Sequence, residues 1–86
     1  MSIHYPNPSR SFDPDKRHIT FWGSDRALEL TFVIDDTALE KLAGTLTTEP
    51  EFLAAFDANR SLIEAAGTKA YERDSQHFHI LSASDF

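Results

Sequence analysis

Two adjacent polar residues, Asn59 and Arg60, are the sharpest candidates for chemistry because they border an apolar helical stripe. The stripe consists of apolar residues at helical spacing: Phe52, Phe56, Ile63 and Ala70. At about 100° per residue, Asn59 and Arg60 fall on the two flanks of this stripe. A guanidinium in that place could receive an anion or a carboxylate, with the amide orienting it. The pair therefore predicts a small-molecule or anion site with Arg60 as the receptor.

The same pair also fits a structural role, which we favour. Asn59 could hydrogen-bond a strand-end or loop backbone, and Arg60 could reach past the helix to a carboxylate such as Asp13, Asp35 or Asp36. Polar groups at a helix seam need partners in either case, because an unpaired buried donor is costly.

Histidine offers a second kind of candidate site. His77 and His79 lie two apart in a predicted strand, so their imidazoles share one side of it, roughly 7 Å apart. His18 lies nearby if its strand pairs with this last one. Histidine clusters can bind zinc or nickel, but a metal site needs three or four ligands and supporting hydrogen bonds. We therefore expect solvated strand histidines, no metal and no cofactor, and keep a histidine-based metal protein as a weak alternative.

Catalytic motifs are missing from the sequence. The three glycines stand alone, so no glycine-rich phosphate loop is present, and no nucleophile elbow occurs. Asp35-Asp36 is better explained as a helix cap than as an acid–base pair. The Asp13-Pro14-Asp15 turn lacks the further ligands of a calcium loop. We expect no enzymatic activity.

Composition narrows the class of partner. The 86 residues carry a net charge of −6, which opposes broad binding to phosphate backbones or to an anionic membrane surface. The chain has no cysteine, which excludes disulfides and cysteine-based zinc sites. The first residues have no basic region followed by an apolar run, and no segment is apolar enough to span a bilayer. We therefore expect a cytoplasmic protein that binds neither nucleic acid nor membrane.

Alternating apolar residues predict strands over residues 10–12, 17–23, 27–34 and 77–81. A four-residue loop over 23–26 would pair Trp22 with Ala27, which places Phe21 opposite Leu28 on one apolar face. The same counting across the first turn pairs Phe12 with Arg17. The first three strands therefore form an antiparallel meander, and the last strand turns Phe78 and Ile80 to one side.

Capping signals predict two helices. Thr37 with Glu40 begins the first, which ends at Gly44, and Thr48 with Glu51 begins a long helix that runs to Arg73. Gly67 interrupts this second helix, either as a site of close packing against the sheet or as a break.

The predicted order is strand, strand, strand, helix, helix, strand, which favours a single α+β domain over residues 1–86. Its two layers would be an antiparallel sheet and two helices packed on one face. Residues 1–9 form an extended lead-in and residues 82–86 a polar tail.

One face of the sheet is left without a cover in this arrangement. Side chains alternate between the two faces along each strand, and this alternation places the following residues on the uncovered face: His18, Thr20, Trp22, Thr31, Val33 and, if Phe78 points inward, His77, His79 and Leu81. An exposed tryptophan beside valine suggests a surface for a protein partner or for self-association, with a homodimer as one form. Alternatively, the lead-in or the tail folds across Trp22 and covers it.

Several segments, taken in order, resemble a family of short bacterial proteins known only as the domain of unknown function numbered 1488. The matching segments are Phe12-Asp13, Ile19-Thr20-Phe21-Trp22-Gly23, Ala38-Leu39, Phe56-Asp57-Ala58-Asn59-Arg60 with Ile63, and Ala70-Tyr71. The resemblance implies a small α+β domain with an antiparallel sheet. It brings no activity and no catalytic residues. Gly67 and Thr68 depart from the family pattern, which leaves the continuity of the long helix open.

Together these observations favour a non-enzymatic interaction or regulatory accessory module that uses the open sheet face around Trp22. The candidate partner surface comprises Trp22, His18, Thr20 and Val33. The alternative is the anion-binding domain with Arg60 as receptor.

Overall fold

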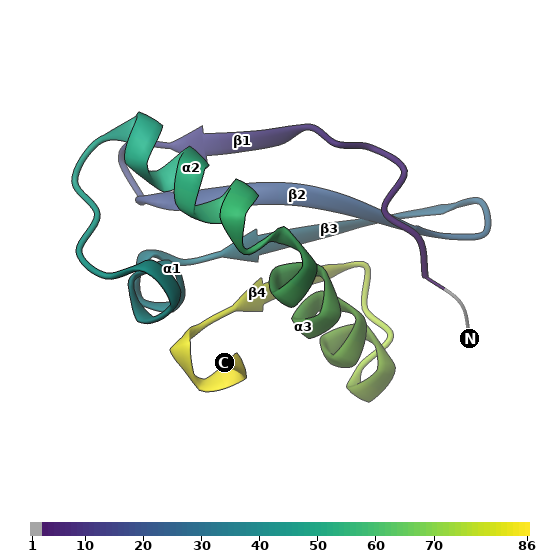
Figure 1. The fold of residues 1–86 in the computed structure, drawn as a ribbon. Coiled ribbons are helices and arrows are strands. Elements are labelled where there is room, and N and C mark those ends of the chain that lie inside the picture. Colours follow the sequence, from purple (N-terminus) through teal and green to yellow (C-terminus); the bar gives the residue numbers. More distant parts are fainter. Residues whose placement is uncertain (1–2) are drawn as a thin grey trace.

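Four strands form one sheet in the order β1-β2-β3-β4, and the helices pack on one side of it (Figure 1). The computed structural model describes residues 3–86, so the first two residues of the predicted lead-in lie outside the described part. The strands are β1 (Arg10–Asp13), β2 (His18–Asp25), β3 (Leu28–Ile34) and β4 (Phe78–Leu81). The helices are α1 (Asp36–Ala43), α2 (Glu49–Ala58) and α3 (Arg60–Arg73), followed by a 3₁₀ turn, η1 (Ala83–Asp85). The α+β fold and the three-stranded meander are confirmed.

The hairpin between β2 and β3 is tighter than predicted. Phe21 pairs with Phe32, not with Leu28, so the four-residue loop was wrong. Both strands extend further, and Asp25 pairs with Leu28 across a two-residue turn. Arg26 takes φ 59° there, a value that such short turns require but that glycine or asparagine usually supplies. Because the register shifted by an even number of residues, the same apolar side chains still face the helices.

The first turn was predicted at the right length but one residue too early, since Asp13 pairs with His18 across a four-residue loop. Phe12 pairs with Ile19, not with Arg17, and Arg17 lies in the turn with φ 55°. The Asp13 carboxylate accepts the backbone N–H groups of Asp15 (2.9 Å) and Lys16 (3.2 Å). These bonds hold the displaced loop, and the register shift is again even, so Phe12 stays on the core side.

The last strand differs from the prediction in both direction and orientation. β4 pairs with β3 in parallel, because the three helices carry the chain back before it re-enters the sheet. The sheet is therefore mixed, with only its first three strands antiparallel. His79 and Leu81 face the helices, whereas Phe78 and Ile80 face away and are 53% and 61% exposed. The condition that Phe78 points inward, on which the placing of His77, His79 and Leu81 on the open face depended, is therefore not met.

The predicted long helix is two helices that meet at Asn59. The capping box of Thr48 and Glu51 is confirmed at the start of α2. At its end, the Asn59 side-chain amide donates to the Ala55 carbonyl (2.9 Å), and the Asn59 backbone leaves the helical region. Figure 1 shows α3 leaving in a new direction from this point. Every member of the predicted stripe is nevertheless buried, because α2 and α3 both turn their apolar sides to the sheet.

Helix α1 is capped by Asp35, which confirms the Asp35-Asp36 cap, and not by the predicted capping box of Thr37 and Glu40. The Asp35 carboxylate accepts the backbone N–H of Ala38 (2.9 Å) and the hydroxyl of Thr37 (2.7 Å), so Asp35 is the N-cap and Thr37 lies inside the helix. The carboxylate is the better acceptor for the free N–H groups of a first turn. Gly44 ends the helix with φ 86°, as predicted.

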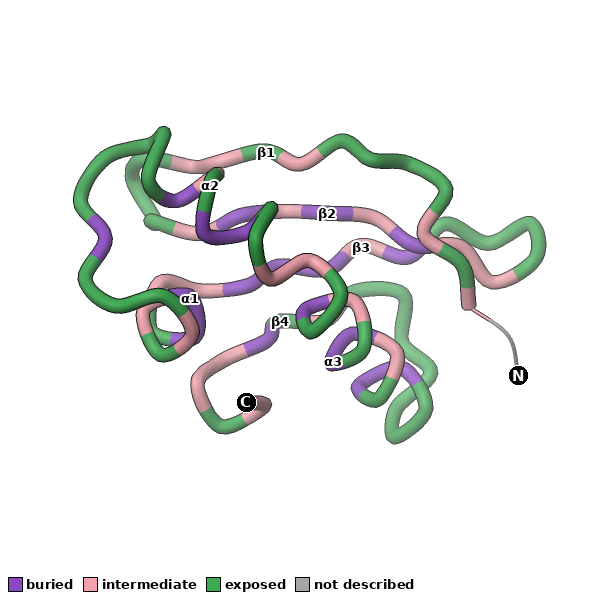
Figure 2. The backbone as a smooth tube through the Cα atoms, in the orientation of Figure 1, coloured by how far each residue is buried: buried purple, intermediate pink, exposed green. Residues whose placement is uncertain are grey.

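Both chain ends contribute to the packing. Tyr5 and Phe86 pack against the buried core, which Figure 2 shows between the sheet and the helices. The Tyr5 hydroxyl donates to the Glu64 carbonyl (2.8 Å) and contacts the Thr68 hydroxyl (3.0 Å). The lead-in therefore ties α3 to the sheet.

Gly67 lies inside α3, which continues through it, so the close-packing interpretation is confirmed. A Cβ at this position would lie 3.0 Å from the Tyr5 hydroxyl and 3.2 Å from the Phe32 ring. Only a residue without a side chain lets α3 approach the sheet this closely.

We predict that Gly67→Ala lowers the free energy of unfolding by about 1 kcal/mol. Overpacking destabilises the folded state by roughly 1–3 kcal/mol, and the higher helix propensity of alanine over glycine stabilises it by about 1 kcal/mol. The loss should shrink in a Tyr5→Phe background, which removes the closest contact. Urea unfolding of the four proteins in this double-mutant cycle measures both effects. A stabilising Gly67→Ala would contradict the close packing.

Candidate functional site

The sheet face turned away from the helices carries two parallel rows of side chains, which we call the open face. One row runs across three strands through Trp22, Thr31 and Phe78. The next row runs through Thr20, Val33 and Ile80 in the same way. Neither row contains a charged side chain. The open face is thus an apolar surface interleaved with two threonine hydroxyls.

Exposure on the open face is greatest at β4. Val33, in the middle of its row, is only 4% exposed, since side chains flank it on both neighbouring strands. Phe78 and Ile80, at the ends of the two rows, are more than half exposed. Adjacent large apolar residues left in water mark an interaction site more often than scattered ones do.

Charged residues stand at the two ends of the open face. His18 and Asp13 pair across β1 and β2 at one end, with 3.9 Å between His18 Nε2 and Asp13 Oδ2. Glu29 pairs with Ser24 at the other end. The apolar rows are therefore framed by polar groups, the usual layout of a docking patch.

Trp22 is half-buried, and within residues 3–86 neither the lead-in nor the tail crosses it. The lead-in runs alongside the end of β2, where the backbones of His4 and Ser24 exchange two hydrogen bonds (2.9 and 2.7 Å). Pro6 and Asn7 of the lead-in line a hollow of about 210 Å³ together with Trp22. The tail packs on the helix side through Phe86. Trp22 is therefore neither fully covered nor fully exposed, which lies between the two predicted alternatives.

The predicted membership of the open face was partly right. The candidate surface residues His18, Thr20, Trp22 and Val33 do share this face. His79 and Leu81 do not belong to it, and Phe78 and Ile80 were missed. The segment 78–81 is apolar at three of its four positions, so its alternation fits either orientation. Only the pairing with β3 decides which side chains face out.

The histidines do not gather into one site. β4 pairs with β3 and not with β2, so His18 lies on the open face while His79 lies on the helix face. The His79 ring stacks on Phe32 with 5.8 Å between ring centroids, and its Nε2 lies 2.9 Å from the Gln76 carbonyl. His79 is therefore half-buried and packed on one face of its ring, whereas His77 is exposed to solvent as predicted. Within residues 3–86, no three His, Cys, Asp or Glu side chains are grouped to hold a metal ion.

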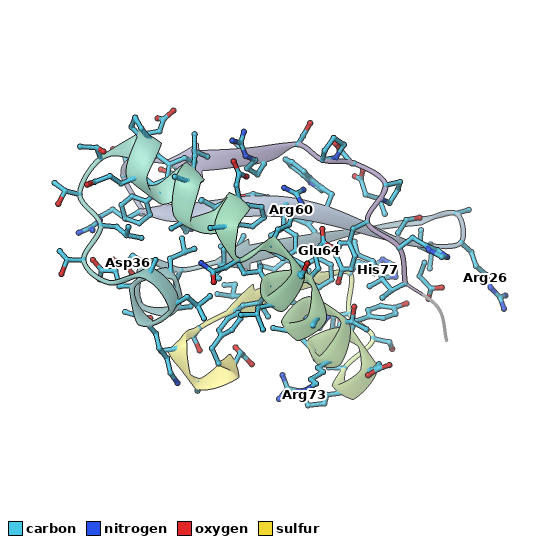
Figure 3. The ribbon with its side chains drawn as sticks, viewed as in Figure 1. Arg26, Asp36, Arg60, Glu64, Arg73 and His77 are labelled. Carbon is cyan, nitrogen blue, oxygen red and sulfur yellow. The ribbon has the colours of Figure 1, made fainter. Side chains whose placement is uncertain are left out.

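Asn59 and Arg60 have partners from the chain itself. Asn59 is the junction of α2 and α3, as described above. Arg60 Nε lies 3.2 Å from Glu64 Oε2, and its guanidinium lies 5.0 Å from the centre of the Phe56 ring (Figure 3). Asp57 is a further carboxylate at 4.0 Å. These partners differ from the predicted aspartates, but they support the structural interpretation. An anion at Arg60 stays a prediction.

A comparison with known families matches residues 3–80 to the family described as "Protein of unknown function (DUF1488)". The chain belongs to this family. The resemblance found in the sequence is confirmed over nearly the whole chain. No curated protein and no solved structure matches this DUF1488 chain. None of the helices in its described residues is long and apolar enough to cross a membrane.

In this DUF1488 chain, one ion pair fixes the edge strand β1 to α2. Arg10 donates from Nε and Nη2 to the two carboxylate oxygens of Asp57, both at 2.9 Å. The Arg10 hydrogen bonds hold the pKa of Asp57 below its ordinary value. Both side chains remain partly exposed, so solvent screens the pair.

We predict that Asp57→Asn flattens the acid limb of the stability profile. A carboxyl group with a lowered folded-state pKa contributes stability above its unfolded pKa of about 3.9, and this contribution is lost as the pH falls through the folded value. The wild type should therefore be more stable than Asp57→Asn at pH 7, and the difference should shrink as the pH falls below about 3.9 and vanish once the pH lies below the folded-state pKa of Asp57. Urea unfolding across this range measures the difference. Asp15→Asn, which removes the same charge without an ion pair in residues 3–86, is the control and should not reproduce it.

Proposed function

We propose that this protein is a non-enzymatic interaction module that docks a protein partner on its open face and acts as a regulatory accessory to that partner. A single observation carries the proposal. The helices pack on one side of the sheet only, and the other side ends in two apolar residues, Phe78 and Ile80, that are 53% and 61% exposed. Burying such side chains is worth about 25 cal/mol for each Å² removed from water.

The layout of the open face supports a protein partner over a small ligand. The two rows form a broad surface across three strands, and the hollow of about 210 Å³ beside Trp22 is below the usual range of about 300–1,000 Å³ for ligand pockets. Trp22 supplies a large amphipathic side chain of a type that is enriched among the residues that contribute most binding energy at interfaces. The net charge of −6 opposes nucleic acid as the partner.

A larger hollow of about 480 Å³, between the first turn and the loop before α2, offers less to a ligand. Its cation, Arg17, donates to the Leu46 carbonyl (2.8 Å) and lies within 4 Å of both the Asp36 and the Glu40 carboxylates. The guanidinium also covers the Phe52 ring. Its charge is therefore already balanced by the chain.

We predict that Thr31→Arg abolishes docking while leaving the fold intact. Thr31 lies at the centre of the open face, and a charge placed there would have to be desolvated by any apolar partner. Leu62→Arg is the control, because it adds the same charge on α3, on the other side of the molecule. Leu62 is an apolar residue that is as exposed (57%) as Phe78 and Ile80 on the open face. Affinity-tagged wild type and both variants are expressed in the native host, and quantitative mass spectrometry compares the proteins they retain.

The expected result is one stoichiometric protein retained by the wild type and by Leu62→Arg but lost from Thr31→Arg. Equal retention by all three would contradict the proposal, as would the absence of any stoichiometric partner. Trp22→Ala adds an independent check, since it should weaken retention with an unfolding midpoint close to that of the wild type. If Trp22→Ala unfolds instead, the ring is part of the core and the open face loses its anchor.

A further inference from the structure

The outer edge of β4 is unpaired, and its hydrogen-bonding pattern defines which groups are free. Thr31 N–H donates to the His77 carbonyl (2.8 Å), and Asp35 N–H donates to the Leu81 carbonyl (3.1 Å). In a parallel ladder, alternate residues of a strand supply both bonds to one neighbour. His77, His79 and Leu81 therefore bond to β3.

The intervening residues, Phe78 and Ile80, direct their N–H and C=O groups away from β3. No backbone or side-chain group in residues 3–86 bonds to them. These same two residues carry the most exposed side chains of the open face. One edge thus offers four unpaired backbone groups beside two apolar side chains, which is the requirement for adding a strand.

The opposite edge of the sheet is protected against strand addition. Pro8 and Pro14 flank β1, and β1 itself contains the charged residues Arg10 and Asp13. Proline and charge are the devices that natural sheets use to block pairing at an edge. The segment 75–84, which contains β4, has neither a proline nor an acidic or basic residue apart from its histidines. The exposed edge of β4 therefore carries neither of these two devices.

We propose that β4 pairs with β4 of a second copy of this chain, in antiparallel orientation, to form one continuous eight-stranded sheet. A twofold axis perpendicular to the sheet makes the two edge strands antiparallel, and closed twofold symmetry is the commonest form of homo-oligomer. Although each copy carries a net charge of −6, the paired segments contain no carboxylate, so no like charges meet at the contact. The inference goes beyond the proposed partner docking and stands without it.

The register follows from which groups are free. Residues directly opposite each other in an antiparallel pair share a face, so Phe78 of one copy lies opposite Ile80 of the other. Each such pair exchanges two N–H···O bonds, and together the two pairs use all four free groups of each strand. The two His79 residues then face each other at the axis, on the helix side. An aromatic side chain opposite a β-branched one is a favourable cross-strand pair.

This dimer joins the two open faces into one. The apolar pairs of Phe78 and Ile80 meet at the centre, with Trp22 and Val33 of each copy further out along the rows. A four-residue strand makes a small contact, so we expect a dimer at the weak end of specific interfaces, which forms at micromolar or higher concentration.

Ile80→Pro tests the proposal at the level of a single N–H group. The Ile80 N–H does not bond to β3, so proline there removes an edge donor and leaves the ladder to β3 in place. Sedimentation equilibrium of the purified chain should show a dimer for the wild type, and Ile80→Pro should raise the dissociation constant at least tenfold. The matched control is Ile80→Thr, which keeps both the N–H and the β-branched shape and should weaken the dimer less.

Three results would contradict the β4–β4 dimer. A wild-type chain that stays monomeric up to its solubility limit would overturn the proposal, as would a dimer that Ile80→Pro leaves unchanged. A dimer abolished by Thr31→Arg but not by Ile80→Pro would place the contact on the open face and also overturn it. If Ile80→Pro fails to fold, Ile80→Lys decides in its place, because a lysine on an edge strand opposes pairing without removing a backbone group. Since this assay contains no other protein, its failure leaves the docking proposal intact.

Discussion

The ring of Phe32 is the contact on which the rest of the structure depends. It is fully buried and stacks on Phe21 from the neighbouring strand, with 5.2 Å between ring centroids. Tyr5 from the lead-in and His79 from the last strand contact the same ring, at 6.0 and 5.8 Å. Helix α3 approaches it at Gly67, where a methyl group would lie 3.2 Å away. One side chain thus joins segments from both ends of the chain, the centre of the sheet and the longest helix.

The orientation of the last strand follows from this contact, and the candidate function follows from the orientation. With His79 packed on Phe32, alternation along β4 sends Phe78 and Ile80 to the other side, where no helix covers them. The parallel ladder to β3 uses the backbone of His79 and leaves the groups of Phe78 and Ile80 free. The same residues therefore provide apolar surface for a partner and an edge for a second copy.

Much of this architecture could be predicted from local pattern, and the errors have a common physical origin. Alternation of the strands and the apolar stripe of the helices depend on side-chain type, so they were identified correctly. The two hairpin turns depend on Arg17 and Arg26 in left-handed conformations, which their residue types do not indicate. Asn59 ends α2 because its side-chain amide donates to the Ala55 carbonyl in the preceding turn. The apolar residues on either side of this break keep helical spacing, so the sequence predicts one continuous helix. The direction of β4 is decided by pairing with β3, which no local pattern encodes.

Amide hydrogen exchange of β4, measured residue by residue with NMR at two protein concentrations, tests the central claim most directly. At low concentration, we expect slow exchange for His79 and Leu81, which bond to β3, and fast exchange for Phe78 and Ile80, which point into solvent. At high concentration, Phe78 and Ile80 should become protected as the edges pair. Equal protection of all four amides in the dilute protein would contradict the unpaired edge, and exchange that does not change with concentration would contradict its pairing with a second copy.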